Sequence, residues 1–210
     1  YLTTDLNISK TLLQQALSEA VNATFNKMVI DNDQSTNDMV LILANGKAKN
    51  KKITSLKDPN FLIFLGPLAF VCNRLVKELV RDGEGVTHVC NVVVRGAKTQ
   101  EEASRLCRQI CSSMLFKTML AGEDPNWGRI MSSIGASQVD FSPKLDISFD
   151  GVPILNNGVE VLKNKQRLRK ILKKKKFCLE INLKKGKFSE RYWTTDLTKF
   201  YVWINSRYST

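Results

Sequence analysis

The sequence predicts an α/β fold in which helices cover a mixed β-sheet. Three observations support this class: helix and strand patterns alternate over the first 135 residues, the crossovers between strand patterns are long enough to hold helices, and strand patterns dominate afterwards. With 210 residues, 43% hydrophobic and 25% charged, the chain has the composition of a globular protein with a sizeable core. We expect two parts within residues 1–210, a helix/strand core at 1–135 and a strand-rich lobe with a basic helix at 136–210.

The first part opens with an amphipathic pattern. Residues 8–25, "ISKTLLQQALSEAVNATF", carry apolar side chains at helical spacing, and residues 39–46, "MVLILANG", predict a short strand. The longest apolar run, "FLIFLGPLAFVC" at 61–72, is shorter than the roughly 20 residues of a membrane-spanning helix, and Pro67 interrupts it. We therefore predict a buried core helix that ends at the "RDGEG" turn, and no membrane partner.

Further elements follow that turn. Residues 86–96, "VTHVCNVVVRG", form a strand pattern, and Thr99 with Glu102 three residues later has the capping-box spacing of a helix start. After residue 135 the patterns are two strands, "KLDISFD" and "GVPIL", then a basic helix and the strand "KFCLEINL". The last two elements are "RYWTTDL" and "KFYVWIN".

Cysteine and histidine usage indicates a reducing compartment and limits the chemistry. Five cysteines, an odd number without a CxxC pair, are typical of a cytoplasmic protein. Cys107 and Cys111 share a helix face, but a zinc site takes about four ligands, and the single histidine, His88, stands alone. We predict packed thiols, no metal site and a structural rather than catalytic His88.

The net charge of +12 is concentrated in one stretch. Val161 to Lys187 holds ten Lys and two Arg against one acid, Glu180, so that the rest of the chain is nearly neutral. Such a stretch, centred on Lys173 to Lys176, can bind phosphate backbones. We favour a solvated amphipathic helix followed by a strand, because no aromatic residues alternate with the lysines as a stacking surface requires. Nucleic acid is therefore not the expected partner.

Three polar clusters mark the ends of predicted elements. The first, "IDNDQSTNDMV" at 30–40, has three carboxylates but misses the calcium-loop spacing, which favours turn chemistry over a metal site. In the second, "RDGEGVTH", Glu84 lies between two glycines and is accessible to a substrate ammonium group. A solvated turn glutamate is the commoner case.

The third cluster, "GEDPNWGRI" at 122–130, combines costly residue types in nine positions. Pro125 forces Asp124 into an extended conformation, Asn126 and Trp127 begin a helix, and Arg129 can reach Glu123 or Asp124. We predict a rigid support near an active site.

Four segments carry a family resemblance, and they are "FNKMVIDNDQSTNDMVLILANG", "RDGEG", "GEDPNWGRI" and "YVWINSRYST". Their order and spacing, over essentially the whole chain, resemble the β subunit of the ornithine acetyltransferase (glutamate N-acetyltransferase) family of arginine biosynthesis. The resemblance implies a four-layer α/β fold of the self-cleaving N-terminal-nucleophile type. It also implies an α subunit cut from the same precursor and an α2β2 heterotetramer.

The resemblance further implies a ping-pong reaction. A threonine at the new β terminus takes the acetyl group from N2-acetylornithine and passes it to glutamate. Its own α-amine, with a reference pKa of about 7.7 to 8.0, can accept the hydroxyl proton without a histidine. That threonine is expected four residues upstream of Tyr1, so no catalytic residue is expected in this chain. No cofactor is implied, and acetyl-CoA is a candidate co-substrate.

By resemblance, the residues that bind the amino-acid part of the substrate are Glu84, Asn205 and Thr210. The residues expected to support the site come from the first and third clusters and are Asp31, Asp33, Thr36, Asn37, Asp38, Asp124, Asn126, Trp127 and Arg129. Two alternatives stay open: a catalytically inactive fragment or paralogue that keeps the fold, and a basic nucleic-acid-binding module.

Overall fold

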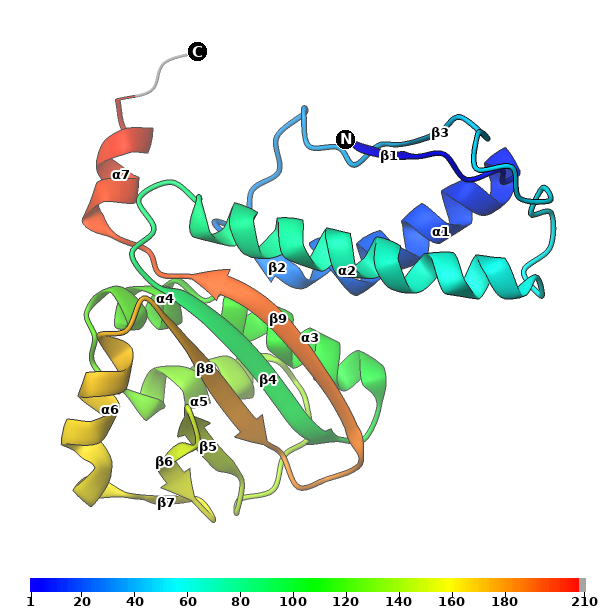
Figure 1. Ribbon diagram of the computed structural model, residues 1–210. Helices are drawn as coiled ribbons and strands as arrows, with labels where there is room; N and C mark the ends of the chain where they lie inside the picture. Colours follow the sequence, from blue (N-terminus) through cyan, green and yellow to red (C-terminus); the bar gives the residue numbers. More distant parts are fainter. Residues whose placement is uncertain (208–210) are drawn as a thin grey trace. The chain divides into compact units, whose positions relative to one another are not determined.

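The computed structural model describes residues 1–207 and divides the chain into two compact units (Figure 1). Unit 1 contains Tyr1–Lys27 and Asp33–Glu78, and unit 2 contains Met28–Asn32 and the residues from Leu79 onward. The boundary expected between residues 135 and 136 falls inside unit 2. Strands from both sides of that position share one sheet, so the two expected parts are not the two units.

Unit 1 is built on one amphipathic helix. Its elements are β1 (Leu2–Thr4), α1 (Lys10–Ala23), η1 (Phe25–Lys27), β3 (Ile42–Ala44) and most of α2 (Pro59–Arg81). Strands β1 and β3 pair in parallel, and the Ser9 side chain caps α1 by accepting the Leu12 N–H. The helix and the strand predicted here are confirmed. Their core consists of Leu12, Ala16, Ala20, Ile53, Phe61, Leu68 and Cys72.

Helix α2 corrects the prediction of a buried core helix. It runs for 23 residues and continues through Pro67. Only 22% of its most apolar 18-residue stretch is buried. Ile63, whose carbonyl loses its helical donor to Pro67, is 68% exposed, so water can supply that hydrogen bond. One side of α2 packs into the core, and the other exposes Leu62, Ile63, Phe70, Val71 and Leu75.

Among residues 1–207, α2 is the helix that is long and apolar enough to cross a membrane. Length and composition alone define this property. A single such helix is weak evidence for a membrane span, because mostly buried core helices have the same property.

Unit 2 contains a mixed sheet, as predicted, and this sheet has seven strands. The strands are β2 (Met28–Val29), β4 (Val89–Ala97), β5 (Asp146–Phe149), β6 (Val152–Asn156), β7 (Val159–Glu160), β8 (Lys176–Asn182) and β9 (Phe188–Thr195). They lie in the order β2-β9-β4-β8-β5-β6-β7. The pairs β4/β8 and β2/β9 are parallel, and the others are antiparallel. The inner strand β4 contributes to the core, with Cys90, Val92 and Val94 fully buried.

Helices complete this layered unit. They are α3 (Gln100–Cys111), α4 (Met114–Ala121), α5 (Trp127–Ala136), α6 (Lys165–Leu172) after the short turn η2 (Leu162–Asn164), and α7 (Lys199–Asn205). Helix α3 packs on β4 and β9, and α5 packs on α3 and α4 (Figure 1). Thr99 caps α3 by accepting the Glu102 N–H at 3.1 Å. Cys107 and Cys111 are buried free thiols on α3, as predicted.

The basic stretch is a solvated amphipathic segment, which agrees with the interpretation that we favoured. Leu168, Ile171 and Leu172 of α6 are buried. Three acids nearby pair with lysines: Asp150 with Lys174 at 2.8 Å, Asp146 with Lys184 at 2.7 Å, and Asp140 with Lys185 at 3.4 Å. These ion pairs reduce the charge available to an external phosphate backbone.

Two phenylalanines on α2 test whether this helix has one buried and one exposed side. Phe61 is 2% exposed and Phe70 is 65% exposed. Phe61→Ala should lower the free energy of unfolding by about 3 to 5 kcal/mol, because it leaves a cavity in the core of unit 1. Phe70→Ala, the matched control, should change it by less than about 0.5 kcal/mol. Chemical denaturation of the purified chain measures both, and equal losses would contradict the two-sided helix.

Candidate functional site

Strand pairing in unit 2 brings distant segments to one end of the sheet. Strand β4 begins at Val89, which pairs with Thr195 at the end of the antiparallel strand β9. Strand β2 runs parallel to β9, so that Val29 lies opposite Thr194. The residues just before β4, just after β9 and just after β2 therefore meet. Each of these segments leads to a predicted site residue, and these residues are Glu84, Asn205 and Asp31.

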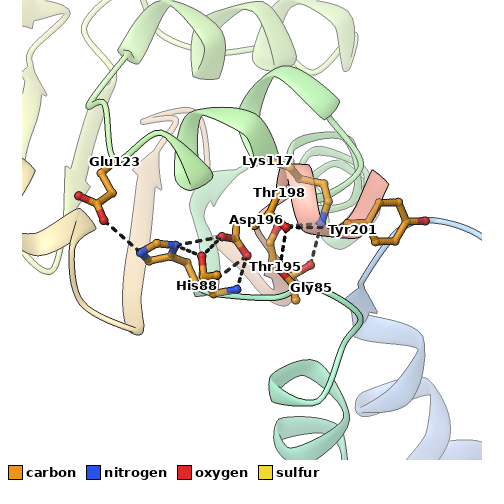
Figure 2. Close-up of polar contacts among 9 residues, drawn as sticks. Gly85, His88, Lys117, Glu123, Thr195, Asp196, Thr198 and Tyr201 are labelled. Atoms are coloured by element: carbon orange, nitrogen blue, oxygen red, sulfur yellow. Dashed lines mark hydrogen bonds and ion pairs between the residues drawn. The ribbon is translucent and has the colours of Figure 1, made fainter. Parts of the chain in front are cut away.

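A buried carboxylate, Asp196, joins the first two segments. It is 4% exposed and accepts the backbone N–H groups of Thr87 and His88, both at 3.0 Å, together with the Thr87 hydroxyl. His88 Nδ1 donates a fourth hydrogen bond at 3.0 Å, which requires a proton on that nitrogen (Figure 2). His88 is thus a buried, hydrogen-bonded residue at the start of β4, as predicted.

Glu84 and Asn205 lie together although 121 positions separate them. The Asn205 side-chain amide donates to Glu84 Oε2 at 2.9 Å and to the Tyr201 carbonyl at 3.1 Å. Gly85 has a φ of +66°, and a Cβ added there would lie 2.6 Å from the Tyr201 nitrogen. Glycine is therefore needed beside Glu84 for the loop to approach α7. Thr210, the third predicted substrate-binding residue, lies outside the described residues.

Lys117 is a site residue that sequence reasoning missed. It lies on α4, is 4% exposed and donates to the Thr195 carbonyl at 2.7 Å and the Thr195 hydroxyl at 2.9 Å (Figure 2). It also donates to the Thr194 hydroxyl at 3.3 Å. Desolvation by burial lowers the pKa of Lys117 to about 8. The available signal was a single lysine in the otherwise apolar sequence "MLFKTMLA".

The first polar cluster is divided between the units. In unit 2, Asp31 accepts the Tyr201 hydroxyl at 3.2 Å and so contacts α7. In unit 1, Asp33, Thr36, Asn37 and Asp38 are exposed. The Asp38 carboxylate there accepts the Ser35 N–H at 3.1 Å, and the Asp38 N–H donates to the Ser35 carbonyl. This is the turn chemistry predicted for the cluster.

The third cluster forms a loop and a helix start, as predicted. Asn126 caps α5 by accepting the Arg129 N–H at 3.4 Å, so the helix begins at Trp127. The partner predicted for Arg129 is wrong. Its guanidinium donates to the Leu115 carbonyl at 3.0 Å and the Thr118 hydroxyl at 3.1 Å, because α4 packs beside α5.

Glu123 connects this cluster to the Asp196 network. Its carboxylate Oε1 lies 3.8 Å from His88 Nε2 (Figure 2). His88 is therefore placed between two carboxylates, one buried and one partly exposed. Asp124, Asn126 and Trp127 face elsewhere and line an open pocket of about 240 Å³ together with Glu160 and Lys165. Neither Glu84 nor Asn205 lines that pocket, so the pocket and the Glu84–Asn205 pair are separate features.

The fold and the site define a mixed-sheet α/β protein in which a carboxylate and an amide from distant segments form a hydrogen-bonded pair. The chain belongs to the ArgJ family, whose model matches residues 1–210. This family is the one that the four sequence segments resemble.

Relatives and a solved structure agree with this assignment. The chain is 39% identical to the arginine biosynthesis bifunctional protein ArgJ of Bacillus cereus and 37% identical to that of Oceanobacillus iheyensis, over all of its own length. It spans 52% of the length of each, about half of these curated relatives. The crystal structure of the Bacillus halodurans protein matches with a TM-score of 0.91 and 37% identity, over 99% of this chain and 98% of that one.

Arg129 tests the structural role of the third cluster. Arg129→Ala removes two hydrogen bonds from a charged donor and should lower the free energy of unfolding by about 1 to 3 kcal/mol, with a lower soluble yield. Arg129→Lys keeps the charge and should lose less. Unchanged stability together with lost turnover in the Ala variant would make Arg129 a catalytic residue.

Lys117 predicts a pH dependence of stability. Its pKa falls from 10.5 to about 8 on folding, so between these values the unfolded chain binds more protons. The free energy of unfolding should therefore rise with pH over that interval, by at most about 3 kcal/mol. Lys117→Met should lack this contribution. Urea denaturation from pH 7.5 to 10.5 compares the two proteins, and parallel pH profiles would contradict the assignment.

Proposed function

We propose that this chain is the substrate-binding subunit of a glutamate N-acetyltransferase of arginine biosynthesis. The Asn205–Glu84 hydrogen bond supports this most directly, because the resemblance assigns both residues to one substrate pocket and they contact each other. Asp196 and Thr198 hold the segments that carry them. The names of the relatives at up to 39% identity are consistent with this pathway.

The hydrogen-bond inventory of the pair indicates the ligand group. Both hydrogens of the Asn205 amide are used, by Glu84 and by Tyr201, which leaves the amide oxygen as an acceptor. Glu84 is exposed, and among residues 1–207 its side chain has Asn205 as its hydrogen-bond partner. The site thus presents acceptors and a negative charge, which complement an ammonium group. N2-acetylornithine carries a free side-chain amine, and glutamate carries a free α-amine.

The covalent step requires a threonine outside this sequence. In the proposed cycle, the threonine hydroxyl attacks the acetyl carbonyl of N2-acetylornithine while its α-amine takes the hydroxyl proton. The C–N bond breaks, and ornithine leaves as the amine with that proton. The glutamate amine then attacks the acetyl-threonine ester, which forms acetylglutamate and restores the hydroxyl. Acetyl-CoA as an alternative donor is part of the same proposal.

The partner in this proposal is the other half of the full-length protein. The chain spans 52% of its curated relatives, and the matched Bacillus halodurans chain has the same extent. The exposed apolar side of α2 supports a need for a covering partner. We propose that the two halves come from one precursor, associate as an α2β2 heterotetramer and work in the cytoplasm, where the five free thiols would persist.

Two alternatives make different predictions. An inactive paralogue would bind substrate without acetyl transfer. A nucleic-acid-binding module would bind DNA or RNA with an affinity that falls steeply with salt, but the acids paired with Lys174, Lys184 and Lys185 weaken that case.

Glu84 is the residue to test. In the full-length protein, Glu84→Gln removes the charge but keeps the shape, and it should raise the KM for acetylornithine and glutamate about tenfold or more. Glu160→Gln is the matched control, because Glu160 lines the separate pocket, and it should leave both values unchanged. Steady-state acetyl transfer measures them. Raised KM values in Glu160→Gln together with unchanged KM values in Glu84→Gln would place the substrate site in that pocket instead.

A further inference from the structure

We propose that Thr198 is a positioning residue that fixes the geometry of the Glu84–Asn205 pair. This inference rests on the proposed function. No role for Thr198 was predicted from the sequence, and its hydroxyl bonds to Gly85 and Tyr201 rather than to either member of the pair. The Thr198 hydroxyl oxygen is hydrogen-bonded both to the loop that carries Glu84 and to the helix that carries Asn205.

The Thr198 hydroxyl makes two hydrogen bonds of different kinds. It accepts the Tyr201 N–H at 3.1 Å and so caps the first turn of α7. It donates to the Gly85 carbonyl at 2.8 Å (Figure 2). Gly85 is the neighbour of Glu84, and α7 carries Asn205. One atom therefore sets the distance between the start of the helix and the loop.

Helix α7 depends on such bonds because core packing does not hold it. The helix has seven residues and none is buried. Side-chain bonds that tie its first turn to the rest of unit 2 include the Thr198 hydroxyl bond and the Tyr201–Asp31 bond of 3.2 Å. A short exposed helix is marginal in water without its cap. The loss of Thr198 would thus free α7 to shift and carry Asn205 away from Glu84.

Asp196 makes Thr198 an effective anchor. Two residues before Thr198, the Asp196 carboxylate accepts the N–H groups of Thr87 and His88. The loop end after Glu84 and the chain leading to α7 are therefore held together on one side. Thr198 closes the same loop on the other side, at Gly85. The Gly85–His88 segment, which follows Glu84 directly, is therefore held at one end by Thr198 and at the other end by Asp196.

This geometry predicts a specific kinetic effect. The pair recognises the ammonium group, while the nucleophile lies outside this chain. A shift of α7 should therefore weaken substrate binding more than it slows the acetyl-transfer step. A merely structural role would lower the amount or stability of the enzyme and leave KM unchanged.

The experiment uses the full-length protein with three substitutions. Thr198→Val has the same shape and loses both hydrogen bonds, whereas Thr198→Ser keeps the hydroxyl. Thr99→Val removes the matched cap of α3, where Thr99 accepts the Glu102 N–H at 3.1 Å. We expect Thr198→Val to raise the KM for acetylornithine and for glutamate about three- to tenfold, with kcat changed less than about twofold. Thr198→Ser should restore both KM values.

The control separates positioning from stability. Thr99→Val should lower the melting temperature about as much as Thr198→Val and leave KM unchanged. An unchanged KM in Thr198→Val, or an equal rise in Thr99→Val, would overturn the inference while the proposed function stands. Absence of acetyl transfer by the unmodified full-length protein would overturn the proposed function and this inference with it.

Discussion

The hydrogen bonds of the buried Asp196 carboxylate are the constraint on which the site depends. A carboxylate removed from water costs several kcal/mol unless donors replace the lost hydration. Here the donors come from two adjacent residues, Thr87 and His88, so the start of β4 is fixed against the end of β9. The Glu84 loop lies on one side of this junction and α7 on the other. The Glu84 loop and α7 lie close together because the hydrogen bonds of the Asp196 carboxylate join the segments that lead to them.

Lys117 adds a second buried charge next to the first. Its ammonium group is satisfied by the Thr195 carbonyl and two threonine hydroxyls. Those hydroxyls donate in turn to the Cys111 and Ile30 carbonyls. The network therefore ties α3, α4, β9 and the residue after β2 to one point. Hydrogen bonds are directional, so these buried polar residues fix how the elements pack more precisely than an apolar contact of the same area would.

The residue types in "GEDPNWGRI" have separate structural uses. Gly122 ends α4, Asn126 caps α5, and Arg129 bonds back to α4. Glu123 faces His88, and Asp124 lies at the open pocket. The segment is thus a compact helix-to-helix connection, and its Glu123 side chain lies beside His88 of the Asp196 network. Its position at the site follows from the packing of α4 and α5.

Local features of the fold were readable from the sequence. The apolar spacing of α1, the Thr99 cap and the Asn126 helix start depend on residues within four positions of one another. The strands β4, β5, β6 and β8 of the mixed sheet were readable for the same reason. The pairing of Glu84 with Asn205 was expected from resemblance to a family, since no local pattern relates residues 121 positions apart.

Other features depended on which elements pack together. Hydropathy predicted that α2 is apolar, but the side that meets α1 determines which of its residues are buried. Arg129 has two acids nearby along the chain, yet its guanidinium bonds to a carbonyl and a hydroxyl of α4. Lys117 became buried because the register of β9 places two threonines opposite it. Neighbours in sequence set the local conformation, whereas strand register and helix packing select the partners of side chains far apart in the chain.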